Sequence, residues 1–110
     1  MPTDFTQNVI LLIQNIPEGK VFTYGKIAKL AGNPNGARQV SWLLHSSTKK
    51  HNLPWHRVIN SQGKIALKSQ DGQDYQKILL EKEGVEISST NKIDLKKFLW
   101  EIKSLENLKI

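Results

Sequence analysis

Cysteine is absent from this sequence of 110 residues. Its absence excludes disulfides, thiolate metal sites and thiol nucleophiles together. The histidines do not offer a replacement, because no carboxylates stand at metal-ligand spacing around them. We therefore expect no zinc ion and no other cofactor. The histidines are His45, His51 and His56.

Long hydrophobic runs are also missing. No apolar stretch approaches the roughly 20 residues that cross a bilayer, and residues 1–10 lack the basic region and apolar stretch of a signal peptide. The chain has no visible internal repeat or interdomain linker, and its length suits one domain with one modest core. These features predict a single domain over residues 1–110, monomeric and cytoplasmic, without membrane contact.

Acidic residues are too few to balance the basic ones. The 16 Lys and Arg residues outnumber the 10 Asp and Glu residues, which gives a formal net charge of +6. In a domain this small, such an excess favours a polyanionic partner, most often nucleic acid. A merely soluble basic surface is the alternative, and charge alone does not choose between the two.

The first third of the chain has the pattern of two helices. Apolar residues at helical spacing predict one helix over residues 5–16, with Thr3 or Asp4 as its cap. A second helix is predicted over residues 24–31, with Thr23 as its N-cap.

A third helix follows after a tight turn. Gly32 is suited to the left-handed position that closes the second helix. Four turn formers, residues 33–36, come next, and apolar periodicity then predicts a helix over residues 37–47. Two short helices joined in this way predict a helix-turn-helix. Many helical hairpins bind nothing, but the basic charge favours DNA as the partner.

The middle of the chain predicts a small hairpin. Residues 47–52 are polar and basic and are expected to form a loop. An extended run at Val58 and Ile59 is followed by a turn over residues 60–63 and by a second extended run over residues 64–67. This order predicts a β-hairpin, the "wing" of a winged helix-turn-helix.

Two further helices are predicted towards the C-terminus. A polar loop over residues 68–73 leads to a helix over residues 74–83, which Gly84 ends. The last helix is predicted from Asp94 onwards, with Asp94 as its N-cap. The positions expected to face inward are Tyr75, Ile78, Leu79 and Lys82 in the first of these helices, and Leu95, Phe98, Leu99, Ile102 and Leu105 in the second.

Together these elements predict a mainly α fold with a small β-hairpin, and three side chains stand out on it. Arg38 lies at the start of the third helix, where a recognition helix presents side chains to DNA, although a solvated arginine is the alternative. Tyr24 opens the preceding helix, where its ring could pack in the core or crowd a phosphate and rotate a nucleotide outward. Trp55, held by the rigid Pro54, could fill the core or offer a face for stacking a base.

Three ordered motifs lie between Ile16 and Glu86: IPEGKVFTYGKIAKLAGNPNGARQV, PWHRVINSQGKI and LLEKEGVEI. They resemble the DNA-binding domain of the O6-alkylguanine-DNA alkyltransferases. The signature of that family is Pro-Cys-His-Arg-Val, whose cysteine takes the alkyl group from guanine. Here tryptophan stands in the cysteine position, as in the alkyltransferase-like proteins, which are not alkyl acceptors. The resemblance implies a winged helix-turn-helix core over about residues 5–90 and an extra C-terminal segment over about residues 92–110.

The resemblance also implies roles for individual side chains. Tyr24 would drive nucleotide flipping, and Arg38 would fill the gap that the nucleotide leaves. Ser41 departs from the family, which usually has glycine there. The lining of the base pocket is assigned to Pro54, Trp55, Val58 and Lys68. Contacts to DNA are assigned to Thr23, Ala37, Gln39 and Ser41.

The remaining matched residues belong to a catalytic network in the enzymes. His56 and Glu83 match the pair that activates the cysteine, and Arg57 lies beside them in the signature. Without a thiolate this pair has no nucleophile to activate, so no catalytic residue is expected. We expect all three side chains to be structural.

The function implied is a non-enzymatic sensor of DNA damage. It would enter the minor groove of duplex DNA, extrude an O6-alkylguanine and hold the base without repairing it. In the family, such complexes pass the lesion to nucleotide excision repair proteins, which are therefore expected partners beside the DNA. A winged-helix DNA-binding regulator without lesion preference is the main alternative. An enzyme that uses His56 as the acceptor is disfavoured, because neutral imidazole substitutes poorly for a thiolate.

Overall fold

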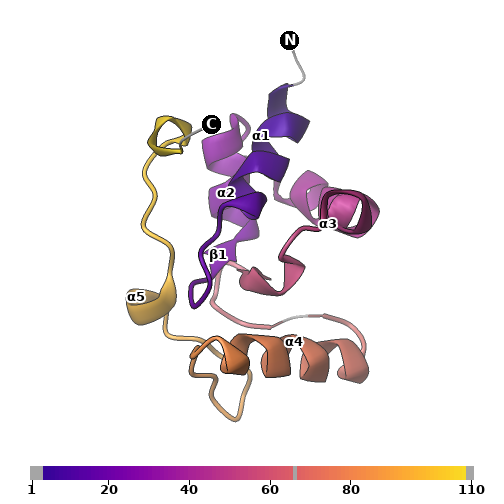
Figure 1. Cartoon of the computed structure of the whole chain (residues 1–110), viewed down its shortest axis with the longest axis vertical. Coiled ribbons are helices and arrows are strands. Elements are labelled where there is room, and N and C mark those ends of the chain that lie inside the picture. Colours follow the sequence, from indigo (N-terminus) through magenta and orange to yellow (C-terminus); the bar gives the residue numbers. More distant parts are fainter. Residues whose placement is uncertain (1–3, 66, 109–110) are drawn as a thin grey trace.

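Three helices form a bundle around one apolar core in the N-terminal half (Figure 1). The computed structural model describes residues 4–65 and 67–108. The predicted cap Thr3 lies outside these residues, and Asp4 begins the first helix. Val9, Ile27 and Val40, one from each helix, are fully buried. The helices are α1 (Asp4–Gln14), α2 (Tyr24–Ala31) and α3 (Ala37–His51).

Local capping signals set the helix-turn-helix that α2 and α3 form. The Thr23 hydroxyl accepts a hydrogen bond from the Lys26 amide at 3.1 Å, and Gly32 adopts φ 114°, so both predicted ends of α2 are confirmed. Gly36 precedes α3, and a Cβ there would lie 2.8 Å from the Phe5 ring. A glycine at position 36 therefore lets α1 approach the turn closely.

The third helix is longer than predicted. Residues 47–52 were expected to be a loop, but α3 continues to His51 and ends where Asn52 adopts a left-handed φ of 52°. The Thr48 hydroxyl bonds the Leu44 carbonyl oxygen within the helix. The polar composition of this stretch reflects its solvent exposure, since nothing in it before Asn52 stops a helix.

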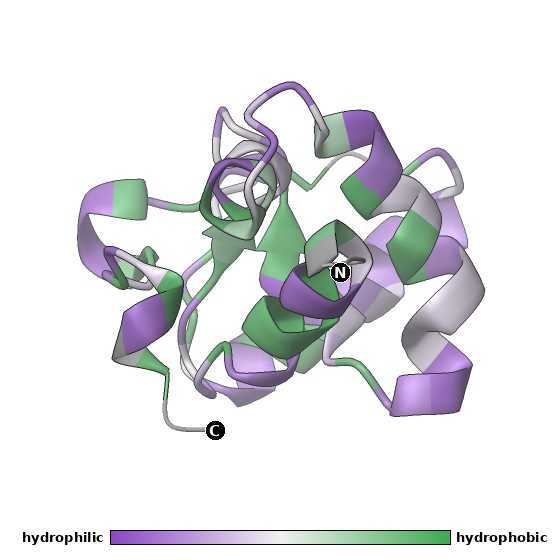
Figure 2. Cartoon of the chain, turned by 90° about the horizontal axis from the view of Figure 1, so that it is seen from above, coloured by the Kyte–Doolittle hydropathy of each residue, from purple (hydrophilic) through white to green (hydrophobic). Residues whose placement is uncertain are grey.

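Two short strands lie at the centre of the molecule (Figure 2). Strand β1 (Phe22–Thr23) pairs in parallel with β2 (Val58–Ile59), and the 3-10 turn η1 (Trp55–Arg57) leads into β2. All four strand residues are buried, three of them apolar, as expected for a parallel pair that is covered on both faces. The predicted pairing of residues 58–59 with residues 64–67 is therefore wrong.

The turn that was predicted between those runs is present. The Gly63 amide donates to the Asn60 carbonyl oxygen at 3.0 Å, and Gly63 has φ 79°. Beyond the turn, Lys64 forms an antiparallel bridge with Lys92. The chain after β2 thus pairs with the segment following the fourth helix.

Helix α4 (Gln70–Lys82) begins four residues earlier than predicted and buries a different face. The Ser69 hydroxyl caps it by accepting from the Gly72 amide. Gln76 and Leu80 are buried, whereas Tyr75 is 56% and Ile78 49% exposed, so the predicted inward face is wrong. The Gln76 side chain donates to the carbonyl oxygens of His56 and Val58, which makes its burial tolerable.

The C-terminal segment is mostly extended instead of helical. The Asp94 cap is confirmed by its bond from the Lys96 amide, but α5 (Leu95–Phe98) has only one turn, and η2 (Leu105–Asn107) is a single 3-10 turn. Between them the chain runs beside β1. The Val21 amide donates to Phe98 at 2.9 Å, and the Trp100 amide donates to Val21 at 2.9 Å. Pairing with the sheet edge therefore overrides the helical periodicity.

The mainly helical fold class is confirmed, with the parallel strand pair in place of the hairpin. Within residues 4–65 and 67–108, no helix is long and apolar enough to cross a membrane. A second apolar cluster packs α4 and the C-terminal segment under the sheet. Its buried members are Val21, Ile59, Ile65, Leu80, Val85, Ile93 and Phe98.

Candidate nucleic-acid interface

Two adjoining cavities lie between the helix-turn-helix and the chain that follows η1. Their volumes are about 570 Å³ and about 340 Å³, within the range of small-molecule sites. Helices α2 and α3 supply one wall, and β2, the turn after it and α4 supply the other. The residues that line both cavities are Tyr24, Ser41, Val58, Leu67 and Gln76.

Most of the predicted site residues meet at these cavities. Trp55 lines the smaller cavity, beside Leu44 and His45 of α3. The predicted residues that line the larger cavity are Tyr24, Ala37, Arg38, Ser41, Val58 and Lys68.

Three of the residues assigned to the base pocket or to DNA contacts lie elsewhere. Pro54 precedes η1 and is half-buried. Gln39 is exposed on the other flank of α3, where it lines a separate cavity with Trp42. Thr23 is buried and its hydroxyl is used to cap α2, so its side chain supports the site from below.

Tyr24 and Arg38 both line the larger cavity, but they differ in how far they are buried. Tyr24, the first residue of α2, packs partly against the core of the bundle. This burial raises the pKa of the Tyr24 phenol, so the hydroxyl stays protonated and uncharged near neutral pH. Arg38, in the first turn of α3, is exposed. The cavity is therefore lined by a phenol that is fixed by packing and by a guanidinium that is exposed to solvent.

Trp55 combines the two roles that the sequence left open. Its indole packs against the core of the bundle and also forms part of the wall of the smaller cavity. The Tyr75 ring lies 5.9 Å away, centroid to centroid, with a tilt of 40°. Tyr75 belongs to α4, so the indole is held between the bundle and α4.

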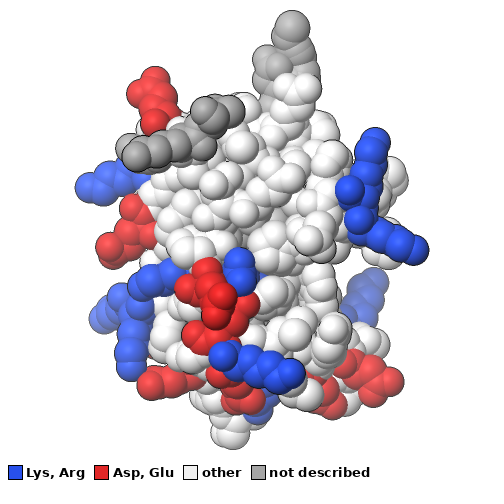
Figure 3. Space-filling view, viewed as in Figure 1, with Lys and Arg blue, Asp and Glu red and all other residues white. Residues whose placement is uncertain are grey.

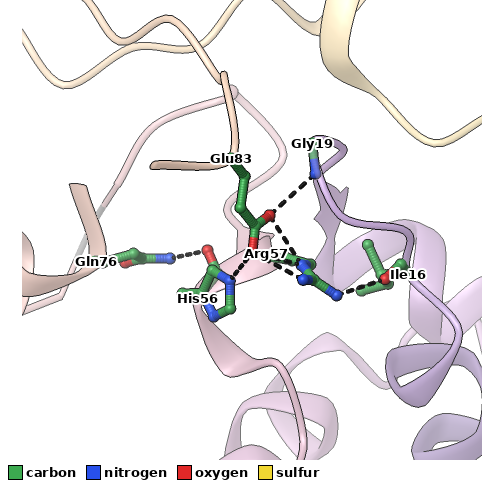
Figure 4. A network of polar contacts seen from close by, with 6 residues as sticks. All are labelled: Ile16, Gly19, His56, Arg57, Gln76 and Glu83. Atoms are coloured by element: carbon green, nitrogen blue, oxygen red, sulfur yellow. Dashed lines mark hydrogen bonds and ion pairs between the residues drawn. The ribbon is translucent and has the colours of Figure 1, made fainter. Parts of the chain in front are cut away.

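A polar network lies behind the indole (Figure 4). The Glu83 carboxylate accepts from Arg57 Nη2 at 2.7 Å and Arg57 Nε at 3.0 Å, and it contacts His56 Nε2 at 2.7 Å. The Gly19 amide donates to Glu83 Oε1 at 3.0 Å, and Arg57 Nη1 donates to the Ile16 carbonyl oxygen at 2.9 Å. The network thus ties η1 to the end of α4 and to the turn after α1.

The charge of Glu83 is strongly stabilised. Burial alone would raise the pKa of this carboxyl, but the hydrogen bonds from Arg57, the Gly19 amide and His56 outweigh it and lower the pKa to about 2. The side chains of Glu83 and Arg57 are only 11% and 17% exposed. Glu83 therefore remains an anion that anchors its neighbours.

Sequence reasoning missed several residues that shape the site. Gln76 lines both cavities and fixes the backbone of η1 and β2. Its spacing from Leu80 and Glu83 places the three on one helical face, a signal that the predicted apolar face of α4 obscured. Leu67 and Tyr75 had no comparable signal, because their positions depend on how α4 packs against η1.

Fold and site together define a helix-turn-helix protein of the DNA-binding class, with cavities between α3 and the chain that follows η1. The chain matches the 6-O-methylguanine DNA methyltransferase DNA-binding domain over residues 4–85. It is 50% identical over 97 residues to a DNA base-flipping protein of Vibrio parahaemolyticus, covering 88% of this chain and 96% of the relative. Alkyltransferase-like protein 1 of Schizosaccharomyces pombe is 41% identical over 102 residues, covering 88% and 94%.

A solved structure matches over nearly the whole chain. The crystal structure of S. pombe Atl1 in complex with damaged DNA containing O6-carboxymethylguanine gives a TM-score of 0.81 at 41% identity, covering 93% of this chain and all of the other. The chain therefore belongs to the O6-methylguanine methyltransferase DNA-binding-domain family, as one of its alkyltransferase-like members.

Proposed function

We propose that this protein is a non-enzymatic sensor that binds O6-alkylguanine in duplex DNA. The observation that carries the proposal is the position of Trp55, which lines a cavity together with Tyr24 and whose ring lies 6.2 Å from that of His56, centroid to centroid. Relatives of similar length are named as base-flipping and alkyltransferase-like proteins, and S. pombe Atl1 was solved with damaged DNA. Both facts favour lesion binding over a regulator without lesion preference.

The proposed mechanism begins with attraction between the basic chain and the phosphates, which is independent of sequence. Helix α3 enters the minor groove. Tyr24 then crowds a phosphate with an uncharged ring, the damaged nucleotide rotates outward, and Arg38 fills the gap in the stack. Extrusion costs a few kcal/mol of unstacking, and less for a base whose pairing is already damaged.

The extruded base is held in the cavity and is not repaired. The chain has no cysteine to accept the alkyl group. The nearest candidate, His56, is committed through Nε2 to Glu83 at 2.7 Å, and neutral imidazole is a weak substitute for a thiolate. Trp55 and Val58 supply apolar surface to the alkylated base, and Lys68 supplies a cation at the rim.

Incubation with a duplex that contains O6-methylguanine tests this proposal. We expect the protein to retain that duplex on a gel, to keep its mass in mass spectrometry, and to leave the lesion intact in the recovered DNA. A stoichiometric gain of one methyl group by the protein would contradict the proposal, and the modified peptide would identify the acceptor.

The long-lived complex is further proposed to present the lesion to nucleotide excision repair proteins. This step is supported by the resemblance to the alkyltransferase-like branch alone. Incision of an O6-alkylguanine duplex by purified excision enzymes should rise when the protein is added and should not rise with Arg38→Ala. Equal incision with and without the protein would remove this part of the proposal.

A further inference from the structure

Helix α3 carries a large exposed indole that none of the roles above uses. Trp42 is 69% exposed, more than Tyr75 or Ile78, the other exposed large hydrophobic side chains among the described residues. An indole covered by a partner buries roughly 150–250 Å². Such an apolar surface on α3 is available to a partner, and its surroundings indicate which kind.

The geometry of α3 directs Trp42 away from the protein. Val40 and Leu44 are buried and face the bundle core. Trp42 lies two residues from each of them, so at 3.6 residues per turn it points in the opposite direction. Arg38, one turn earlier, and Lys49, two turns later, share this outward stripe, and both are exposed.

Helix α3 is a ridge between two hollows. Ala37, Arg38 and Ser41 line the cavity of about 570 Å³ on one flank. The other flank borders a cavity of about 520 Å³ between α3, α1 and the turn before α3. The residues that line this second hollow are Phe5, Thr6, Asn33, Gln39, Trp42 and Leu43.

The charge around the second hollow suits an anionic chain. Helix α3 has no acidic residue along its 15 residues, and its last turn carries Lys49, Lys50 and His51. The residues that line the hollow are all uncharged. Figure 3 shows Lys and Arg side chains over α3 without acidic neighbours, whereas red and blue mix around α4. A phosphate backbone can therefore approach this hollow without meeting a carboxylate among the residues that line it.

We propose that Trp42 contacts the DNA strand opposite the extruded nucleotide, with its indole against the sugars and base edges of that strand. The inference rests on the proposed function, in which α3 enters a groove of the duplex. A helix in a groove has one sugar-phosphate backbone on each flank. The nucleotide that enters the larger cavity comes from the strand on the flank of Ala37 and Ser41, so the other strand faces the flank of Gln39 and Trp42.

The test compares three DNA molecules at one salt concentration: a duplex with O6-methylguanine, the same duplex with guanine, and the single strand with O6-methylguanine. Trp42→Ala should weaken binding to both duplexes about tenfold, the size of a lost aromatic contact, and leave binding to the single strand unchanged. Trp42→Phe should retain part of the duplex affinity. The control Ile78→Ala, which removes an exposed apolar side chain of α4, should bind all three like the wild type.

Two results would overturn the inference. One is wild-type affinity of Trp42→Ala for both duplexes, which would assign the indole to a partner other than DNA. The other is an equal loss on the single strand, which would place Trp42 on the damaged strand. If the wild type shows no lesion preference, the proposed function fails, but loss of duplex affinity in Trp42→Ala alone would still support the contact. Because the indole is exposed, the urea unfolding curve of Trp42→Ala should match the wild type.

Discussion

At residue 55, an indole stands beside a hydrogen-bonded network that is complete without it. Glu83 receives hydrogen bonds from Arg57 and the Gly19 amide and contacts His56, and none of these bonds involves Trp55. The side chain at this position can therefore differ within the family while the backbone around it keeps its shape. The hydrogen bonds of the network, and not the indole, fix the backbone around η1.

Arg38 and Tyr24 are the side chains on which extrusion is expected to depend. Arg38→Ala should weaken binding to an O6-methylguanine duplex by about 10- to 100-fold, because it leaves the gap in the base stack unfilled.

Tyr24→Ala should weaken binding and slow extrusion, which stopped-flow fluorescence of a 2-aminopurine beside the lesion would follow. Gln70→Ala, an exposed change on α4, is the control. Wild-type binding by both variants would refute these assignments.

Glu83 should make the free energy of unfolding fall as the pH is lowered below its ordinary pKa. Its native pKa is about 2, below the ordinary 4.5, so the unfolded chain takes up the proton first as the pH falls. The stabilisation is therefore complete above pH 4.5 and is lost between pH 4.5 and about 2. Glu83→Gln should lower the free energy of unfolding by on the order of 3 kcal/mol at pH 7, with the difference shrinking towards pH 2.

Urea unfolding at several pH values measures this difference. Glu86→Gln is the matched control, because Glu86 pairs with Lys97 at 3.2 Å between side chains that are 74% and 58% exposed. Such an exposed pair contributes little, so the control should unfold like the wild type. A Glu83→Gln penalty that stays constant from pH 7 to pH 2 would contradict the role assigned to this carboxylate.

At the scale of elements, the sequence predicted well what local contacts determine. Thr23 and Gly32 cap α2 because a hydroxyl and a left-handed glycine act within one helical turn. The family resemblance assigned Tyr24, Arg38, Trp55 and Val58 to one site, and the structure brings them to adjoining cavities. The capping predictions needed no knowledge of distant contacts, whereas the site came from the resemblance.

The errors concern contacts between distant segments. The strand of Val58 and Ile59 pairs with β1 across more than thirty residues, a choice that no turn signal encodes. The C-terminal segment has helical periodicity, yet its backbone pairs with Val21. The inward face of α4 includes Gln76, a polar residue. Its burial is stabilised because its side chain donates hydrogen bonds to the carbonyl oxygens of His56 and Val58. In each case tertiary partners outweigh local propensity.

The extended C-terminal segment should contribute to stability through Trp100. Its ring meets Phe22 edge-on, with centroids 5.1 Å apart at 69°. Trp100→Ala should lower the free energy of unfolding by about 2–3 kcal/mol, less than for a fully buried tryptophan because Trp100 is half-buried. Urea denaturation measures the loss, with the exposed Lys96→Ala as control. An unchanged unfolding midpoint for Trp100→Ala would mean that this segment does not stabilise the sheet.

At the scale of the whole molecule, the site lies where two apolar clusters meet. One cluster fills the three-helix bundle, and the other packs α4 and the C-terminal segment under the sheet. The Glu83 network ties α4 to η1 and to the turn after α1 (Figure 4). Val58 of the first cluster and Ile59 of the second both line the larger cavity. The shape of the cavities is therefore determined by how the two clusters are held together, and the helix-turn-helix alone would not form it.

The net charge of +6 should make binding to every duplex depend on salt. Raising the salt concentration from 50 to 200 mM should weaken binding to damaged and undamaged duplexes by similar factors, because the phosphate contacts are the same in both. The ratio of the two affinities should stay nearly constant, since extrusion and the fit of the base in the cavity are not ionic. A ratio that falls to one at the higher salt would show that the preference is itself electrostatic.

The central claim is that this protein recognises a damaged base by holding it outside the helix. Binding titrations at one fixed salt concentration test it most directly, with two duplexes that differ only in O6-methylguanine against guanine at one position. We expect tighter binding to the O6-methylguanine duplex, because a weakened pair is cheaper to open and the cavity accepts the extruded base. Equal affinity for the two duplexes would contradict the account and would leave a winged-helix protein that binds DNA without regard to damage.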